Sequence, residues 1–138
     1  MKQLPIGIQD FNKIIQGEYL YIDKTKDIHK MITSHATCFL SRPRRFGKSL
    51  LISTLEEIFN ANRELFKGLW IEQSNYNWQK HPVIRIDFSK IPNSNIDEFI
   101  DEFNQRLVSI AKIYDVSLDT HRSPAGKIGT LIRELCQK

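Results

Sequence analysis

One stretch of the sequence decides the expected fold: Ser41-Arg42-Pro43-Arg44-Arg45-Phe46-Gly47-Lys48-Ser49-Leu50-Leu51. Pro43 lacks a backbone N–H and disfavours helical backbone at the residue before it, and Gly47 allows a tight turn, so residues 41–47 are predicted to form a loop. A helix is predicted to begin at about Lys48, because apolar residues then recur with a helical period. These residues are Leu51, Leu55, Ile58 and Phe59.

The segments on either side of this loop and helix predict an α/β fold. Thr37 to Leu40 is a short uncharged run that is typical of a strand covered on both faces, and Pro82 to Phe88 is a β-branched run introduced by a proline. Strands that alternate with helices favour a parallel sheet with flanking helices. Because two strands alone leave both edges of a sheet unpaired, the chain is expected to be the N-terminal half of such a domain.

Three further helices are expected, over residues 25–34, 96–114 and 123–137, and residues 4–23 are expected to form an extended arm or a short strand. Each helical segment carries an apolar stripe that recurs every three or four residues. Candidate N-terminal caps are Asp23 or Thr25 for the first helix, Asn93, Ser94 or Asn95 for the second, and Ser123 for the third.

Composition and charge narrow the function classes. The chain has 138 residues, and its net charge of +4 arises in the first half, where the densest cluster is Arg42, Arg44, Arg45 and Lys48. An anion such as phosphate would relieve the repulsion within this cluster. The two cysteines and four histidines lack metal-ligand spacing, and the sequence has neither a signal-peptide core nor an apolar stretch long enough to span a membrane. A cytoplasmic location without a membrane partner is therefore expected.

The loop and helix start match the phosphate-binding pattern G-x-x-x-x-G-K-[ST] at every defined position except the first, where Arg42 stands. In this pattern the turn at Gly47 aims N–H groups at one anion, Lys48 reaches the β and γ phosphates, and Ser49 binds Mg²⁺. The alternative is a basic loop that caps a helix and binds stray anions. The residues predicted to bind the nucleotide are Arg42, Pro43, Arg44, Arg45, Phe46, Gly47, Lys48, Ser49 and Leu50, with Lys48 also as the catalytic residue and Ser49 as the metal ligand.

The same residues resemble those of a bacterial AAA-ATPase-like family, whose phosphate loop reads R-P-R-R-F-G-K-[ST]-L. The arginine at position 42 therefore matches the pattern of the family. The resemblance implies a P-loop, AAA-like fold that uses ATP and Mg²⁺ through a variant Walker A loop. Other segments that resemble the family are Leu4-Pro5-Ile6-Gly7, Asp10-Phe11, Tyr21-Ile22-Asp23-Lys24-Thr25, Leu65-Phe66-Lys67-Gly68-Leu69, Pro82-Val83-Ile84 and Asp87-Phe88-Ser89.

The resemblance also implies how the chain divides into two parts and which further parts of the protein would follow it. Residues 1–35 would be an N-terminal arm and helix, and residues 36–138 the P-loop core, truncated before the strand that carries the Walker B acid. The continuing chain is expected to enter that strand within about 15 residues. Longer family members often add a C-terminal nuclease-like domain of the PD-(D/E)XK type. ATP hydrolysis is implied by the resemblance alone, and the 138-residue chain by itself is expected to be inactive because it lacks the Walker B acid.

A few other residues have two possible roles. Asp87 could be a carboxylate on the metal side of the site, but a cap for the loop that follows it is preferred. The residue types favour a helix start at Asp23, Lys24 and Thr25. The resemblance alone suggests that these residues lie beside the nucleotide. Arg44 and Arg45 could touch phosphate, touch an absent domain, or form a solvated basic loop.

The rival function is a non-catalytic module whose basic loop binds nucleic acid or an acidic protein. A strand-binding groove usually combines several basic patches with interleaved aromatic residues, and this sequence has a single basic cluster. The nucleotide hypothesis is therefore preferred.

Overall fold

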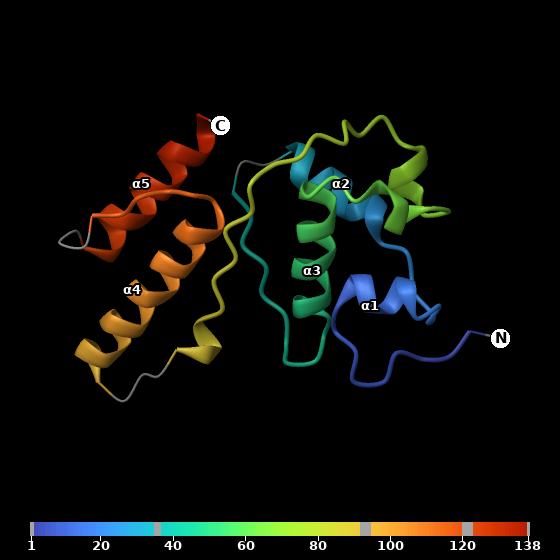
Figure 1. Cartoon of the computed structure of the whole chain (residues 1–138). Coiled ribbons are helices and arrows are strands. Elements are labelled where there is room, and N and C mark those ends of the chain that lie inside the picture. Colours follow the sequence, from blue (N-terminus) through green and yellow to red (C-terminus); the bar gives the residue numbers. More distant parts are fainter. Residues whose placement is uncertain (1, 35–36, 92–94, 120–122, 138) are drawn as a thin grey trace. The chain divides into compact units, whose positions relative to one another are not determined.

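The computed structural model describes residues 2–34, 37–91, 95–119 and 123–137. These residues form two compact units, Met1–Val83 and Ile84–Lys138, each with its own hydrophobic core. The elements of the N-terminal unit (Figure 1) are α1 (Phe11–Gln16), α2 (Thr25–Ser34), α3 (Lys48–Phe59) and the 3₁₀ helices η1 (Arg63–Phe66) and η2 (Trp70–Gln73). Those of the C-terminal unit are η3 (Phe88–Lys90), α4 (Ile96–Ile113) and α5 (Pro124–Cys136).

The predicted α/β fold with a parallel sheet is wrong. No strand occurs in the part of the chain that the structure describes. The run from Thr37 to Leu40 is exposed, with Phe39 95% accessible, and the run from Pro82 to Asp87 leads into η3 without pairing into a ladder. A strand is stabilised by pairing and by cross-strand contacts, so an apolar β-branched run is not enough by itself to produce one.

The predicted helices are confirmed. The helices expected over 25–34 and from Lys48 are α2 and α3, and those expected over 96–114 and 123–137 are α4 and α5. Asn95 caps α4 by accepting the N–H of Glu98 at 2.8 Å, and Ser123 caps α5 ahead of a proline in its first turn. Asn93 and Ser94, the other two candidate caps, lie outside the described residues.

The N-terminal unit is built around stacked aromatic rings. Phe11 of α1 stacks on Phe66 of η1 with 4.7 Å between ring centroids, and Phe66 also contacts Trp78 at 5.2 Å. The buried hydroxyl of Ser53, on α3, accepts the N–H of Phe11 at 3.0 Å. Helix α1, which the sequence analysis did not predict, begins because Asp10 accepts the N–H of Lys13. The rest of this core consists of Ile28, Ile58 and Ile71.

Asp23 and Thr25 connect the start of α2 to η2. The Asp23 carboxylate accepts from the Thr25 N–H at 2.8 Å and from the Thr25 hydroxyl at 2.7 Å, and its second oxygen accepts from the Trp70 N–H at 2.7 Å. The buried Thr25 hydroxyl in turn accepts the N–H of Ile71 at 3.1 Å. Partial burial acts to raise the pKa of Asp23, but the hydrogen bonds from Trp70 and Thr25 outweigh it and hold that pKa below its usual value.

We expect the substitution Asp23→Ala to lower the free energy of unfolding of the N-terminal unit by about 1–2 kcal/mol, because it removes the acceptor of three hydrogen bonds. Urea unfolding followed by tryptophan fluorescence measures this, since Trp70 and Trp78 both lie in that unit. Because the folded pKa of Asp23 is lowered, the contribution of Asp23 to stability should be complete above the unfolded pKa of about 4 and should be lost as the pH falls through the lower, folded pKa.

The variant Asp101→Ala is the control for this measurement, because Asp101 is an exposed carboxylate of α4 in the other unit. It should leave the fluorescence transition unchanged at every pH. If Asp23→Ala were as stable as the unchanged protein at neutral pH, the hydrogen bonds of Asp23 that connect α2 to η2 would not contribute to the free energy of unfolding.

The C-terminal unit is a pair of helices with the preceding segment packed against them. Leu107 of α4 and Leu131 of α5 are fully buried, and Ile84 and Ile86 pack on the same core. Lys127, although buried, keeps a polar partner, because its Nζ donates to the Asn104 side-chain oxygen at 2.8 Å.

Candidate phosphate-binding site

The N-terminus of α3 is open. Gly47 precedes the helix with φ 75° and ψ 17°, in the left-handed region that glycine adopts readily, and no side chain caps this end. The first intrahelical bond runs from the Leu51 N–H to the Gly47 carbonyl at 2.9 Å. The N–H groups of the first helical turn are therefore available to an external acceptor, and the helix dipole makes an anion the favoured one.

The loop before α3 is held by its own carbonyl groups. The Lys48 ammonium donates to the carbonyl of Arg42 and, at 3.0 Å, to that of Pro43. The Arg42 guanidinium donates to the Phe46 carbonyl at 3.4 Å, and Arg45 has a left-handed backbone with φ 68°. All of these side chains are exposed, so Lys48 can exchange its carbonyl acceptors for a solvent-borne anion at little cost in packing.

A hollow of about 550 Å³ opens at this helix end. It brings together five residues of the predicted site and a segment of the N-terminal arm that the sequence analysis did not assign to it. The complete lining is Gly7, Ile8, Gln9, Arg45, Gly47, Lys48, Ser49 and Leu50. The lining thus offers cations, backbone donors and one hydroxyl, and it includes no carboxylate.

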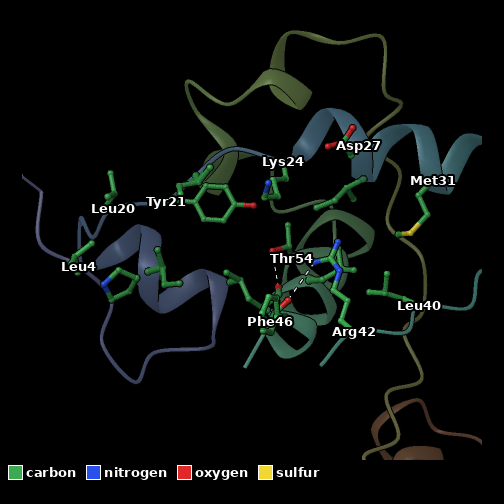
Figure 2. A pocket seen from close by; sticks show the side chains of 17 residues that line it. Leu4, Leu20, Tyr21, Lys24, Asp27, Met31, Leu40, Arg42, Phe46 and Thr54 are labelled. Atoms are coloured by element: carbon green, nitrogen blue, oxygen red, sulfur yellow. Dashed lines mark hydrogen bonds between the residues drawn. The ribbon is translucent and has the colours of Figure 1, made fainter. Parts of the chain in front are cut away.

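A second cavity, of about 490 Å³, adjoins the same loop, with Gly47 and Leu50 in the walls of both (Figure 2). Helix α2 and the segment before it form the opposite side, and Lys24 and Arg42 extend into the space between. Its other lining residues are Leu4, Pro5, Ile14, Leu20, Tyr21, Ile22, Asp27, Ile28, Met31, Leu40, Phe46, Leu51 and Thr54. Of the predicted nucleotide-binding residues, Pro43 and Arg44 line neither space.

Comparison with known proteins identifies the family. The family model described as "Predicted AAA-ATPase" matches residues 5–138, nearly the whole chain. The chain belongs to this family. The resemblance read from the phosphate-loop residues is therefore confirmed. One relative is an uncharacterized protein in the vnfD 5′ region of Azotobacter chroococcum mcd 1. The two sequences are 38% identical in an alignment of 138 positions, which covers 96% of this chain and 26% of the relative. The chain thus spans about a quarter of that relative's length. No solved structure matches.

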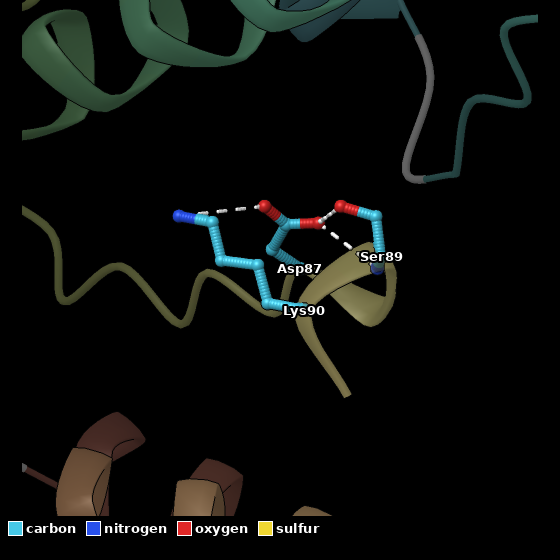
Figure 3. A network of polar contacts seen from close by, with 3 residues as sticks. All are labelled: Asp87, Ser89 and Lys90. Atoms are coloured by element: carbon cyan, nitrogen blue, oxygen red, sulfur yellow. Dashed lines mark hydrogen bonds and ion pairs between the residues drawn. The ribbon is translucent and has the colours of Figure 1, made fainter. Parts of the chain in front are cut away.

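In this predicted AAA-ATPase family member, Asp87 has local partners. One carboxylate oxygen accepts from the Ser89 N–H at 3.1 Å and from the Ser89 hydroxyl at 2.6 Å, and the other lies 3.7 Å from the Lys90 Nζ (Figure 3). The hydrogen bonds from Ser89 hold the pKa of Asp87 below its usual value. Asp87 caps η3, as the preferred interpretation of the sequence predicted.

No group of three or more His, Cys, Asp or Glu side chains suited to a metal ion occurs among the residues with a described placement. Within the same residues, no helix is both long and apolar enough to cross a membrane.

Proposed function

We propose that this chain binds ATP with Mg²⁺ and that the triphosphate occupies the hollow at the N-terminus of α3. The observation that carries the proposal is the uncapped end of α3, with Gly47 in a left-handed conformation and Lys48 in the first turn, facing a hollow lined by donors and cations. A helix end of this kind binds phosphate through backbone N–H groups and the helix dipole. Membership of the predicted AAA-ATPase family supports the use of a nucleotide.

Lys48 and Ser49 have distinct roles in the proposal. Lys48 leaves the carbonyls of Arg42 and Pro43 and neutralises the charge on the terminal phosphates. Ser49, exposed in the first turn of α3, supplies a hydroxyl to Mg²⁺. The hydroxyl is a hard oxygen ligand of the kind Mg²⁺ prefers. Among the residues that line the hollow, only Gln9 has another side-chain oxygen, so the ion would be held mainly by the phosphates and by water.

Hydrolysis would need a further group. Phosphoryl transfer to water requires a residue that positions the attacking water, and no carboxylate lines the hollow. We propose that the part played by this chain is to position the nucleotide and to stabilise charge through Lys48.

Titration of the chain with ATP and Mg²⁺ tests the proposal. We expect saturable binding that is lost when EDTA removes the metal and that weakens only moderately between 50 and 200 mM salt. A basic loop that binds nucleic acid would instead lose about a thousandfold or more in affinity over a salt range of this order, if it made six or more phosphate contacts. Binding of a single-stranded oligonucleotide with such a steep salt dependence, without binding of ATP, would favour the rival function.

A further inference from the structure

We infer that a third cavity of the N-terminal unit, of about 510 Å³, binds a neutral saccharide. The cavity is lined by two residues of α2, His29 and Thr33, and by five residues of the segment 75–81, which follows η2. None of them lines either of the spaces at the phosphate loop, so this site is separate from the proposed nucleotide site. The volume is within the range of about 300–1,000 Å³ that is usual for small-molecule sites.

The first argument is the charge of the cavity wall. The residues that line it include no lysine, arginine, aspartate or glutamate. Three of them are carboxamides, Asn75, Asn77 and Gln79, and the others are two histidines, a tyrosine and a threonine. Burial raises the pKa of the Tyr76 phenol, which therefore stays uncharged. An ion that entered this cavity would lose water without gaining an oppositely charged partner, so the wall favours an uncharged ligand.

The second argument is the unused hydrogen-bonding capacity of the wall. Within the described part of the chain, the carboxamides of Asn75, Asn77 and Gln79 have no hydrogen-bond partner, and neither does the Tyr76 hydroxyl. A carboxamide and a phenol can each both donate and accept hydrogen bonds. A sugar hydroxyl also does both, so a ligand with several hydroxyl groups matches the chemistry of this wall.

The third argument is that the core of the N-terminal unit holds the wall in place. Tyr76 contacts Trp78 edge to face with 5.3 Å between ring centroids, and Trp78 contacts the buried Phe66 at 5.2 Å. The His29 ring lies against Trp70 at 5.4 Å and against Tyr76 at 5.9 Å. A site fixed in this way loses little conformational freedom when a ligand binds, and its aromatic rings offer apolar surface to the C–H faces of a sugar.

Two other classes of ligand fit this wall less well. A peptide that adds a strand needs a regular row of free backbone groups. Here the Gln79 N–H donates to the Asn77 carbonyl at 2.7 Å and the His81 N–H donates to the Phe59 carbonyl at 2.7 Å, so the row is interrupted. A nucleic acid needs cations for its phosphates, and the residues that line the cavity include neither lysine nor arginine. The side chains are therefore the recognising groups.

NMR titration of the isotope-labelled full chain tests the inference. The probes are glucose, galactose, mannose and N-acetylglucosamine, and the competing probe is an alanine-serine-alanine peptide with both ends blocked. We expect at least one sugar to shift the side-chain amide signals of Asn75, Asn77 and Gln79 in a saturable way and to bind more tightly than the peptide. If no sugar shifts these signals, or if the peptide binds at least as tightly as the best sugar, the inference is overturned.

Gln79→Ala tests the hydrogen-bonding wall. It should weaken the best sugar about threefold to tenfold, the loss expected for one hydrogen bond between uncharged groups. Gln73→Ala is the matched control, because Gln73 is an exposed glutamine of η2 in the same unit and does not line the cavity. It should leave the affinity unchanged. Equal sugar affinities in the two variants would overturn the inference.

Thr33→Trp tests the location by filling the cavity, and it should weaken the best sugar at least about tenfold. Thr33 is exposed on α2, and its hydroxyl donates to the His29 carbonyl at 2.8 Å. Ser109→Trp is the matched control, because Ser109 is exposed on α4 and its hydroxyl donates to the Gln105 carbonyl at 2.9 Å. It should leave the affinity within about twofold. Should Thr33→Trp fail to fold, Asn77→Trp tests the same wall from another exposed position. Unchanged sugar affinity in a folded variant of either kind would overturn the inference.

Discussion

The variant Lys48→Ala should bind ATP with Mg²⁺ about tenfold to a hundredfold more weakly than the unchanged chain. A hydrogen bond to a charged group is worth about 1.5–3 kcal/mol, and every 1.4 kcal/mol is a tenfold change in affinity. The Lys48 ammonium lies at the open end of α3 and donates to two loop carbonyls. Isothermal titration calorimetry with matched Mg²⁺ measures the change.

Lys26→Ala provides the control, because Lys26 is an exposed residue of α2 that lines neither of the two spaces. It changes the net charge of the chain by the same amount and should leave the affinity within about twofold. Titration curves that coincide for Lys48→Ala and the unchanged chain would contradict the proposed phosphate site.

The largest effect on stability is expected from Phe66→Ala, which should lower the free energy of unfolding of the N-terminal unit by about 3–5 kcal/mol. The Phe66 side chain is fully buried and touches the rings of both Phe11 and Trp78. Truncation leaves a cavity between α1, η1 and the segment that carries Trp78. Since a whole domain is stable by about 5–15 kcal/mol, much of this unit's stability would be lost. Urea unfolding followed by tryptophan fluorescence gives the difference.

Phe39→Ala is a matched control in the same unit, because the Phe39 side chain is 95% exposed. Its unfolding free energy should stay within about 0.5 kcal/mol of the unchanged protein. If Phe39→Ala destabilised the unit as much as Phe66→Ala does, the burial of Phe66 and the exposure of Phe39 described above would be incorrect.

The helices were predictable because their signals are local. Asp23 before α2, Asn95 before α4 and Ser123 before α5 are capping residues that stand next to apolar stripes of helical period, and the structure uses all three side chains as acceptors. Helix α1 has the same kind of cap at Asp10, but its six residues are too short to show a clear period.

The sheet was not predictable in the same way. The runs at 37–40 and 82–88 have the composition of strands, but a strand depends on a neighbour that local sequence cannot supply. In the structure the first of these runs exposes Phe39, and the second ends in η3, where the Asp87 cap bends the chain.

The candidate site was predictable in part. Gly47, Lys48 and Ser49 form a contiguous pattern whose chemistry follows from the residue types, and the structure places them at one helix end. Lys24, just before α2, and Asp27, in its first turn, line the cavity that adjoins the same loop and are more than a dozen residues away from it in sequence. The sequence analysis placed Lys24 beside the nucleotide only through the family resemblance, and no local pattern marks Asp27.

The turn at Gly47 limits which residues can occupy this position by their backbone handedness and not by their side-chain volume. An added β-carbon at this position would meet no atom within 4 Å, so there is room for a larger residue. What excludes most residues is the positive φ of 75°, which costs an ordinary L-residue about 1–2 kcal/mol. Asparagine, which enters this region more easily than other side-chain-bearing residues, would be the least disruptive replacement, and β-branched residues the most disruptive. The chirality of the amino acid thus sets the limit on variation at this point of the chain.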